Sequence, residues 1–198
     1  MLGKKTMTLK NNTRRDFIRG VAGIAGITAL AACTVTKNGS VTTLTLNTQQ
    51  VEDYGNAVLS FASTAIGVSF VASGLGVSGV AIAMAAITEL KDGLDALNKA
   101  ANGKATVEYD NASVKTAFDS IVAAVKKING YIVATITSTV ANSDVVNNAK
   151  VAANAASGII SIIQGLVDTY ATPKRVGASL KADAYIAEIH TWRKSLTR

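Results

Sequence analysis

Apolar residues recur at alternating steps of three and four along four successive stretches of this chain, and this spacing constrains the fold more than any other feature. A helix makes one turn every 3.6 residues, so residues spaced in this way lie on one of its faces. The four stretches are Val51, Tyr54, Val58, Phe61, Ala65, Val68 and Ala72; Val80, Ala83, Ile87, Leu90, Leu94, Leu97 and Ala101; Val114, Phe118, Ile121, Val125, Ile128, Ile132, Ile136 and Val140; and Val146, Ala149, Ala153, Ala156, Ile160, Ile163, Val167 and Tyr170. The sequence therefore predicts four long helices.

Short segments rich in glycine or polar residues separate these stretches, at residues 73–76, 103–110 and 142–143. Helices joined by short connections pack antiparallel to their neighbours in sequence. We therefore expect an all-α protein, an up-and-down four-helix bundle with one additional C-terminal amphipathic helix.

Local signals support this assignment. Asn47 followed by Gln50 resembles a capping box, and Ser143 is a suitable cap for the fourth helix. Two consecutive four-residue steps through Ile132 predict an irregularity late in the third helix. The many Thr, Val and Ile residues of 131–140 leave a strand as the alternative there, because these residues are weak helix formers.

The C-terminal segment after Pro173 has a shorter apolar seam amid charged residues. Its members are Ala178, Ala182, Tyr185, Ile189, Trp192 and Leu196. We favour an end helix that packs along the bundle. The alternative is a docking helix for a partner or for the membrane surface, with Tyr185, Ile189 and Trp192 as its contact residues.

The first 32 residues have the anatomy of an export signal. A basic start precedes the uncharged run 20–32, which is too short to span a membrane and ends in small residues. The segment Thr13-Arg14-Arg15-Asp16-Phe17-Ile18-Arg19 resembles the twin-arginine motif of bacterial export signals, with Ile18 and Arg19 in place of the usual Leu and Lys. That resemblance implies twin-arginine export, and the general export route is the alternative.

The segment Leu30-Ala31-Ala32-Cys33 is similar to the lipobox of bacterial lipoproteins. The resemblance implies that residues 1–32 are a signal peptide and that Cys33 is lipidated and becomes the first mature residue. An ordinary buried helix over 17–32, with Cys33 as a small core residue, is the alternative. The two motifs occur in the right order near the N-terminus, and this favours the signal.

The residues after Cys33 are rich in threonine, and residues 48–198 form the predicted bundle domain. We favour a polar, flexible tether over residues 33–47, since an isolated two-stranded hairpin is marginally stable in water; a small hairpin is the alternative. In Gram-negative lipoproteins an aspartate after the cysteine is associated with retention in the inner membrane. Thr34 occupies that position here, so the resemblance implies an outer-membrane lipoprotein that faces the periplasm.

The net charge of +7 resides mostly in the first 32 residues. From residue 33 onward, 14 Lys and Arg stand against 12 Asp and Glu, which leaves +2. These charges are scattered, whereas proteins that bind nucleic acids gather positive charge in a patch or stripe. We therefore expect no nucleic-acid binding.

Residues suited to catalysis are scarce. The chain has one histidine, His190, and one cysteine, which lipidation would remove as a nucleophile or ligand. Glu89, Asp92 and Asp95 lie close together on the second helix, a pattern typical of a solvated face rather than of a calcium loop. We expect no enzyme activity, metal or cofactor. The alternative, an enzyme that uses His190, requires a cleft around that residue.

Residues 54–88 contain no charged side chain, and the glycine-rich residues 71–79 separate two apolar arms. A membrane-inserting hairpin is one interpretation. The second arm, 77–88, would be about 18 Å long as a helix, whereas the hydrocarbon core of a bilayer is about 30 Å thick. We favour two buried helices of the bundle.

Together these features predict a non-enzymatic lipoprotein of the bacterial cell envelope that acts as a helical binding or structural module. Its expected partners are the membrane, through the lipid on Cys33, the export machinery, and either another protein or a second copy of itself. The alternative is a membrane-active protein that inserts residues 54–88, as pore-forming or envelope-perturbing proteins do.

Overall fold

The computed structural model describes residues 28–30, 33–38, 41–171 and 182–197, which are mainly helical. In chain order the elements are β1 Thr28–Leu30, β2 Cys33–Asn38, β3 Val41–Asn47, α2 Thr48–Ala65, α3 Ser69–Ala101, β4 Thr106–Glu108, α4 Ala112–Ile128, a π-helical turn Asn129–Val133, α5 Ala134–Ser138, α6 Asp144–Ala171 and α7 Ala182–Ser195. The predicted all-α class is confirmed.

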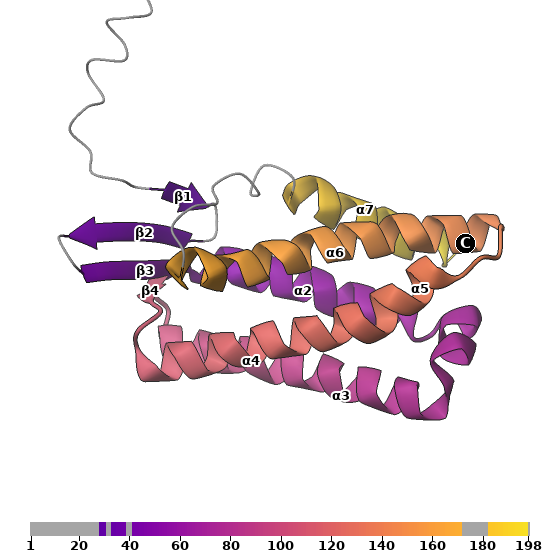
Figure 1. The fold of residues 1–198 in the computed structure, drawn as a ribbon, viewed down its shortest axis with the longest axis horizontal. Coiled ribbons are helices and arrows are strands. Elements are labelled where there is room, and N and C mark those ends of the chain that lie inside the picture. The colour runs from indigo at the N-terminus through magenta and orange to yellow at the C-terminus, as the bar shows by residue number, and fades with distance from the viewer. Residues whose placement is uncertain (1–27, 31–32, 39–40, 172–181, 198) are drawn as a thin grey trace, which may run out of the picture.

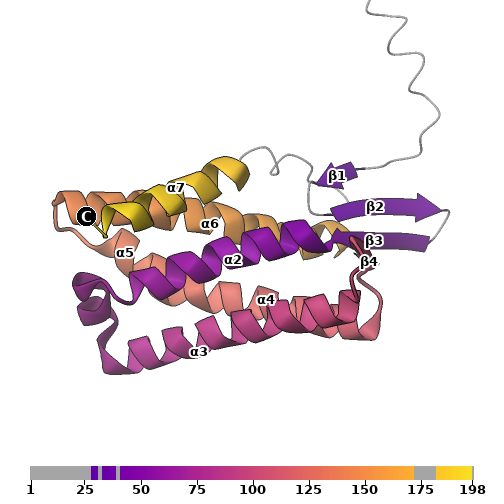
Figure 2. The ribbon, with the colours of Figure 1, turned by 180° about the vertical axis from the view of Figure 1, so that it is seen from behind.

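The long helices run side by side, and a small antiparallel sheet in the order β1-β2-β3-β4 lies at one end of them (Figure 1). α2 contacts both α3 and α6, α3 contacts α4, and α5 contacts α6, so these helices surround a common core. α7 lies along α6 and α2 (Figure 2). Helices that are neighbours in the chain are thus also neighbours in space, as short connections require.

Most of the buried core residues belong to the predicted seams. Phe61 of α2, Leu90 of α3, Phe118 of α4 and Ile160 of α6 are each at most 1% exposed. The first half of α6 contributes mainly small residues, since Ala149, Ala152, Ala153, Ala155 and Ala156 are all fully buried, and its second half contributes isoleucine and leucine side chains. The side chains of Val167 and Tyr170, together with Pro173 and Ala178, lie outside the described residues.

The irregularity predicted in the third helix is a π-helical turn at Asn129–Val133. A π-helical turn takes one more residue than an α-helical turn. Ile128, Ile132 and Ile136 therefore all remain on the core side, with no exposed surface, despite two steps of four. The helix prevails over the strand alternative as far as Ser138, and Val140 lies beyond its end with 97% of its surface exposed.

The connection between the first two helices differs from the prediction. α2 ends at Ala65, and α3 begins at Ser69 after a short turn, so the expected continuation of the first helix to Ala72 is wrong. The expected break within residues 73–76 does occur, at Gly76, where φ is 65° and ψ is 175°. A residue without Cβ adopts this conformation at no steric cost, so the long straight part of α3 starts at Val77.

The polar tether predicted for residues 33–47 is wrong for the described residues, because they form the hairpin of β2 and β3. Leu44 and Leu46 are fully buried in the same core as the helices. β4, which the sequence did not predict, pairs with the end of β3 and anchors the hairpin to the bundle. The Thr48 hydroxyl strengthens that attachment, because its one proton is donated to the carbonyl oxygen of Lys104 at 2.8 Å, with that of Ala105 as a second acceptor at 3.1 Å.

Side-chain caps define the helix starts. Asn47 Oδ1 accepts the backbone N–H of Gln50 at 3.1 Å, so the predicted cap of α2 is confirmed. Ser143 Oγ accepts the N–H of Val146 at 3.4 Å at the start of α6. Asn111 Oδ1 accepts the N–H of Ser113 at 3.1 Å and thereby caps α4. Each cap satisfies an N–H group that has no partner within its helix.

Three glycines allow helices to approach closely. A Cβ built on Gly55 of α2 would lie 2.5 Å from Leu94 Cδ2 of α3, and one on Gly93 would lie 2.9 Å from Ile121 Cγ1 of α4. A Cβ on Gly158 of α6 would overlap the ring of Tyr185 on α7. A larger residue at Gly55 or Gly158 would displace a neighbouring side chain, whereas at Gly93 it would also crowd the backbone nitrogen of Ile121, 3.3 Å away.

Candidate functional site

The candidate lipidation site, Cys33, is the first residue of β2 and is paired with Leu46 of β3. On its other edge β2 is paired with β1, where Leu30 lies opposite Cys33. The export-signal residues Arg14, Arg15, Phe17 and Ala32 lie outside the described residues. Because β2 pairs with β3 along its full length, the attachment of the hairpin to the bundle does not depend on β1.

The predicted docking surface on α7 is a packing surface. Ile189 is fully buried and Trp192 is 4% exposed, while Tyr185 is half-buried against Gly158 of α6. The Trp192 ring lies 5.5 Å from the ring of Phe61, centroid to centroid. The docking alternative for these residues is therefore wrong, and their burial agrees with the favoured interpretation of an end helix packed along the bundle.

His190 and the carboxylates of α3 do not converge. His190 is exposed on α7 and does not line the groove of about 320 Å³ between α6 and α7, to which Glu188 and Thr191 contribute. Glu89 forms an ion pair with Lys127 of α4 at 2.7 Å, while Asp92 and Asp95 are exposed. Within the described part of the chain, no three His, Cys, Asp or Glu side chains are placed to hold a metal ion.

A polar cluster that the sequence did not reveal joins the β4–α4 turn to α4. The Tyr109 hydroxyl donates to Asp119 Oδ1 at 2.6 Å, and Lys115 Nζ donates to the Tyr109 oxygen at 2.8 Å and to Asp119 Oδ2 at 2.9 Å. The ring of Tyr109 packs edge-on against that of Phe118. The i,i+4 spacing of Lys115 and Asp119 was the one signal for it in the sequence.

The electrostatics of this cluster keep Tyr109 protonated and the other two groups charged. Burial, together with the hydrogen bond to Asp119, raises the pKa of Tyr109. Although burial opposes it, hydrogen bonds from Tyr109 and Lys115 lower the pKa of Asp119. Hydrogen bonds to Tyr109 and Asp119 raise the pKa of Lys115. Each of the three side chains is therefore held in the protonation state that its hydrogen bonds within the cluster require. The role of the cluster is to fix the turn between β4 and α4.

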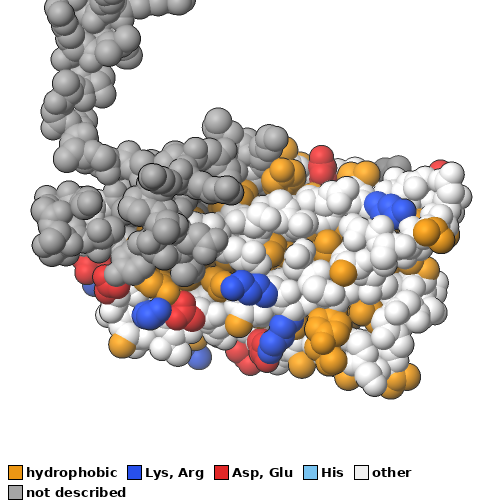
Figure 3. All heavy atoms as spheres, viewed as in Figure 1, with side chains coloured by type: hydrophobic (Ala, Val, Ile, Leu, Met, Phe, Trp, Pro, Cys, Tyr) orange, Lys and Arg blue, Asp and Glu red, His pale blue; other side chains and the backbone are white. Residues whose placement is uncertain are grey.

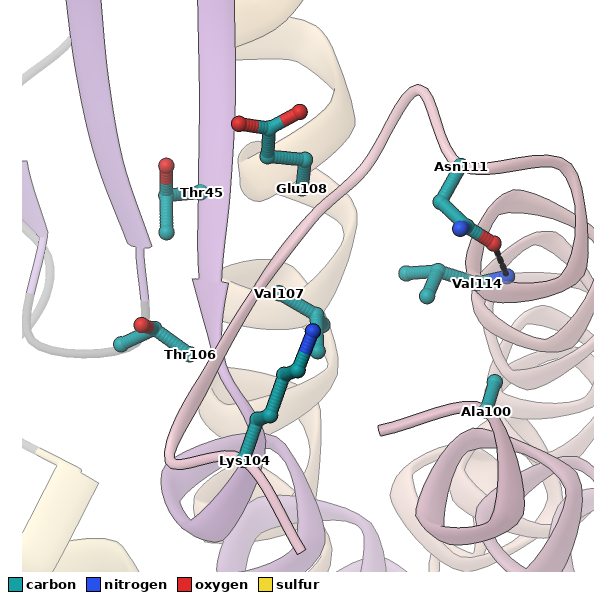
Figure 4. Close-up of a pocket in the computed structure, with 8 residues that line it drawn as sticks. All are labelled: Thr45, Ala100, Lys104, Thr106, Val107, Glu108, Asn111 and Val114. Atoms are coloured by element: carbon teal, nitrogen blue, oxygen red, sulfur yellow. Dashed lines mark hydrogen bonds between the residues drawn. The ribbon is translucent and has the colours of Figure 1, made fainter. Parts of the chain in front are cut away.

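A pocket of about 450 Å³ lies where β3, β4 and the start of α4 meet (Figure 4). It is lined by Thr45, Ala100, Lys104, Thr106, Val107, Glu108, Asn111 and Val114. The side-chain oxygen of Asn111 is engaged in capping α4. The described lining residues include no cysteine, serine or histidine, and the polar side chains among them are Thr45, Lys104, Thr106, Glu108 and Asn111.

The most distinctive surface is the N-terminal half of the straight part of α3. Val77 is 91% exposed, Met84 55% and Ile82 39%, and Tyr131 of the neighbouring π-helical turn is 39% exposed. In Figure 3 the Lys, Arg, Asp and Glu side chains over α3 and α4 lie toward the sheet end, and none is visible over these two helices at the opposite end.

Two helices of the described chain are long and apolar enough to cross a membrane. The mean hydropathy of the most apolar 18-residue window is 2.0 in Ser69–Ala101 and 1.2 in Asp144–Leu166. The second window is 56% buried, as in the core helix of a soluble protein, whereas the first is only 17% buried. Exposure therefore distinguishes α3 from an ordinary core helix.

Comparison of the chain with protein families, with curated proteins and with solved structures finds no match. Any assignment of function therefore depends on the motifs and geometry described above.

Proposed function

We propose that this protein is a non-enzymatic lipoprotein of the bacterial envelope, anchored through Cys33, whose helical domain is a binding or structural module. The observation that carries the proposal is the coincidence of two boundaries. The lipobox-like segment ends at Cys33, and the hairpin attached to the bundle begins at the same residue. Cleavage before Cys33 would remove one short edge strand and leave β2 paired with β3.

The anchoring geometry differs from that of a tethered domain. β2 leads through a tight hairpin into β3, and β3 contributes two fully buried leucines to the core. A lipid on Cys33 would therefore hold the sheet end of the bundle close to the bilayer. We also propose sorting to the outer membrane, with the domain in the periplasm. This part rests on the resemblance to Gram-negative lipoproteins, because Thr34 occupies the position at which an aspartate is associated with retention in the inner membrane.

The decisive experiment compares the native chain with Cys33→Ala and with Thr34→Ala, a matched change at the next position of β2, in a bacterial host. Intact mass and membrane fractionation are measured for each. We expect the native chain and Thr34→Ala to lose residues 1–32, gain the mass of lipid and fractionate with membranes. We expect Cys33→Ala to gain no lipid and to leave the membrane fraction. An unprocessed native chain, or a Cys33→Ala chain that remains embedded, would refute the proposal.

The export route is tested separately with Arg14→Lys combined with Arg15→Lys, which preserves charge. Twin-arginine export predicts that the precursor of this variant accumulates unprocessed in the cytoplasm. Normal processing would assign the protein to the general route and leave the lipid anchor unaffected.

The second candidate function is membrane insertion of residues 54–88, favoured by the exposure and the hydropathy of α3. Insertion would withdraw Tyr54, Val58 and Phe61 of α2 from the core, at about 1.5–3 kcal/mol for each fully buried side chain. The two candidate functions predict different behaviour of the protein in water. The first predicts that the Cys33→Ala chain unfolds cooperatively without detergent and leaves vesicles intact, whereas the second predicts release of a trapped dye from vesicles.

A further inference from the structure

A second apolar seam runs along the outside of α3. Its members, which we call the outer seam, are Val77, Ala81, Met84 and Thr88, and all four are exposed. Their steps of four, three and four match the heptad spacing with which one helix packs against another. The same spacing continues through Lys91, Asp95 and Asn98, so the seam is uncharged and mainly apolar for three turns and then becomes charged and polar.

The apolar half of this surface has a sharp electrostatic boundary. No charged residue occurs in 66–88 or in 128–143, the two segments that form this side of the bundle at the end far from the sheet. Glu89 and Lys127 are the first charged residues on the two helices, and they pair with each other at 2.7 Å. Tyr131, which is 39% exposed, lies in the π-helical turn that contacts α3. Depletion of charge with an aromatic residue at the edge is typical of the centre of a protein interface.

We propose that the outer seam binds the same surface of a second copy of this chain, with the two α3 helices antiparallel across a two-fold axis. Centring the axis on the seam places Ala81 opposite Met84 and Val77 opposite Thr88 of the other copy. The long side chain of Met84 then meets the small Ala81, and Val77 meets Thr88, which is of similar size, so the two helices can approach closely. The inference goes beyond the proposed function and does not require lipidation of Cys33.

Charge favours this orientation over the parallel one. In the antiparallel pair, Lys91 lies past Val77 of the other copy, where the straight part of that α3 begins, so it meets no like charge on that helix. In a parallel pair, Lys91 would meet Lys91 and Asp95 would meet Asp95, and like charges at such positions repel. An isologous antiparallel contact also closes a dimer without leaving a free binding surface.

A lipid surface fits the same face less well. Helices that lie on membranes have Lys and Arg along their polar side, and residues 66–88 and 128–143 contain neither. Heptad spacing is a requirement of a helical partner and not of a bilayer. A lipid anchor at Cys33 would also lie at the opposite end of the bundle from the outer seam.

The test cross-links the native lipoprotein in its membrane with a short thiol-specific reagent. Met84→Cys is compared with Asn98→Cys, which lies two heptads further along the same exposed face. The control is the parent chain, whose single cysteine is Cys33. A lipidated Cys33 has no free thiol, so cross-linking of the parent would show that lipidation had failed. We expect a covalent dimer from Met84→Cys alone, because the two copies of residue 98 would be about 46 Å apart at a rise of 1.5 Å per residue.

A charge placed in the seam provides the second measurement. Sedimentation velocity is run on the Cys33→Ala chain and on the same chain with Met84→Lys or Asn98→Lys, and circular dichroism verifies that each is folded. We expect Met84→Lys to weaken dimerisation by a factor on the order of ten or more and Asn98→Lys to leave it unchanged.

Three outcomes would overturn the inference. Cross-linking of both cysteine variants or of neither would exclude the antiparallel seam. A dimer that Met84→Lys does not weaken would use another surface. A monomeric Cys33→Ala chain that binds neutral phospholipid vesicles, and loses that binding with Met84→Lys, would identify a bilayer as the occupant.

Discussion

The closeness of α3 and α4 can be tested with one methyl group. Gly93 lies where these helices meet, and a Cβ at this position would lie 2.9 Å from Ile121 Cγ1 and 3.3 Å from the backbone nitrogen of Ile121. The side-chain atom can give way, but the backbone nitrogen can move only with α4. Gly165 of α6 is the matched control, because a Cβ there meets no atom of the described residues within 4 Å.

The expected magnitudes follow from two opposing effects. Replacing glycine by alanine inside a helix stabilises it by about 1 kcal/mol, because the unfolded chain loses conformational freedom. Adding a methyl group to a fully packed contact costs about 1–3 kcal/mol. Gly165→Ala should therefore raise the free energy of unfolding by about 1 kcal/mol. Gly93→Ala should leave it unchanged or lower it by as much as about 2 kcal/mol.

The assay is chemical and thermal unfolding of the two variants beside the parent, followed by circular dichroism. For a chain of this size, Tm changes by about 2–4 °C for each kcal/mol. The difference between the variants isolates the steric cost, because both gain the same helix propensity. If Gly93→Ala stabilises the protein as much as Gly165→Ala does, the close approach of α3 and α4 is wrong.

Two further predictions concern α7 and the polar cluster. Trp192→Ala should lower the free energy of unfolding by about 3–5 kcal/mol, because it empties the buried site beside Phe61. The control, Leu196→Ala, changes a 39% exposed position and should alter the free energy of unfolding by no more than about 0.5 kcal/mol. Chemical unfolding measures both variants. Because the pKa of Asp119 is lowered in the folded state, the stability it contributes is present above its ordinary pKa of 3.8 and is lost as pH falls through the folded value. Asp119→Asn should remove that acid-dependent part, which is below about 1 kcal/mol for a side chain 48% exposed, and an unchanged pH profile of unfolding would contradict the assignment. The pKa of Tyr109 is raised, so the stability it contributes is full below its ordinary pKa of 10.0 and is lost as pH rises through the folded value; Tyr109→Phe should flatten the alkaline side of the same profile.

The helices of this protein could be predicted because their signal is local and repeated. A 3.6-residue period sets which residues share a face, and Leu90, Phe118 and Ile160 are buried as their spacing required. Even the defect near Ile132 was visible, since two steps of four do not fit a regular helix and the chain accommodates them in a π-helical turn. The exact break at Gly76 was less predictable, because several glycines and serines around it could all have interrupted the helix.

Short strands and packed edges were not predictable in the same way. Residues 106–108 become a strand only because the end of β3 is available to pair with them. The hairpin of residues 33–47 is stable because Leu44 and Leu46 enter the helical core. This contact joins residues that are distant in the chain, so the local sequence around the two leucines could not predict it. The sequence favoured packing of Trp192 along the bundle but left docking to a partner open, and its burial against Phe61, more than a hundred residues away in the chain, decided for packing.

The sequence by itself therefore determined the all-α class, the positions of the seams and the position of Cys33 within its motif, because each depends on residues close together in the chain. Only the tertiary structure decided that the Thr-rich segment is part of the fold, that the docking residues of α7 are core residues and that the exposed apolar surface lies on α3. These three results depend on which surfaces of the helices and strands pack against other elements. Within the described chain, the exposed half of α3 is the apolar surface that no other element covers.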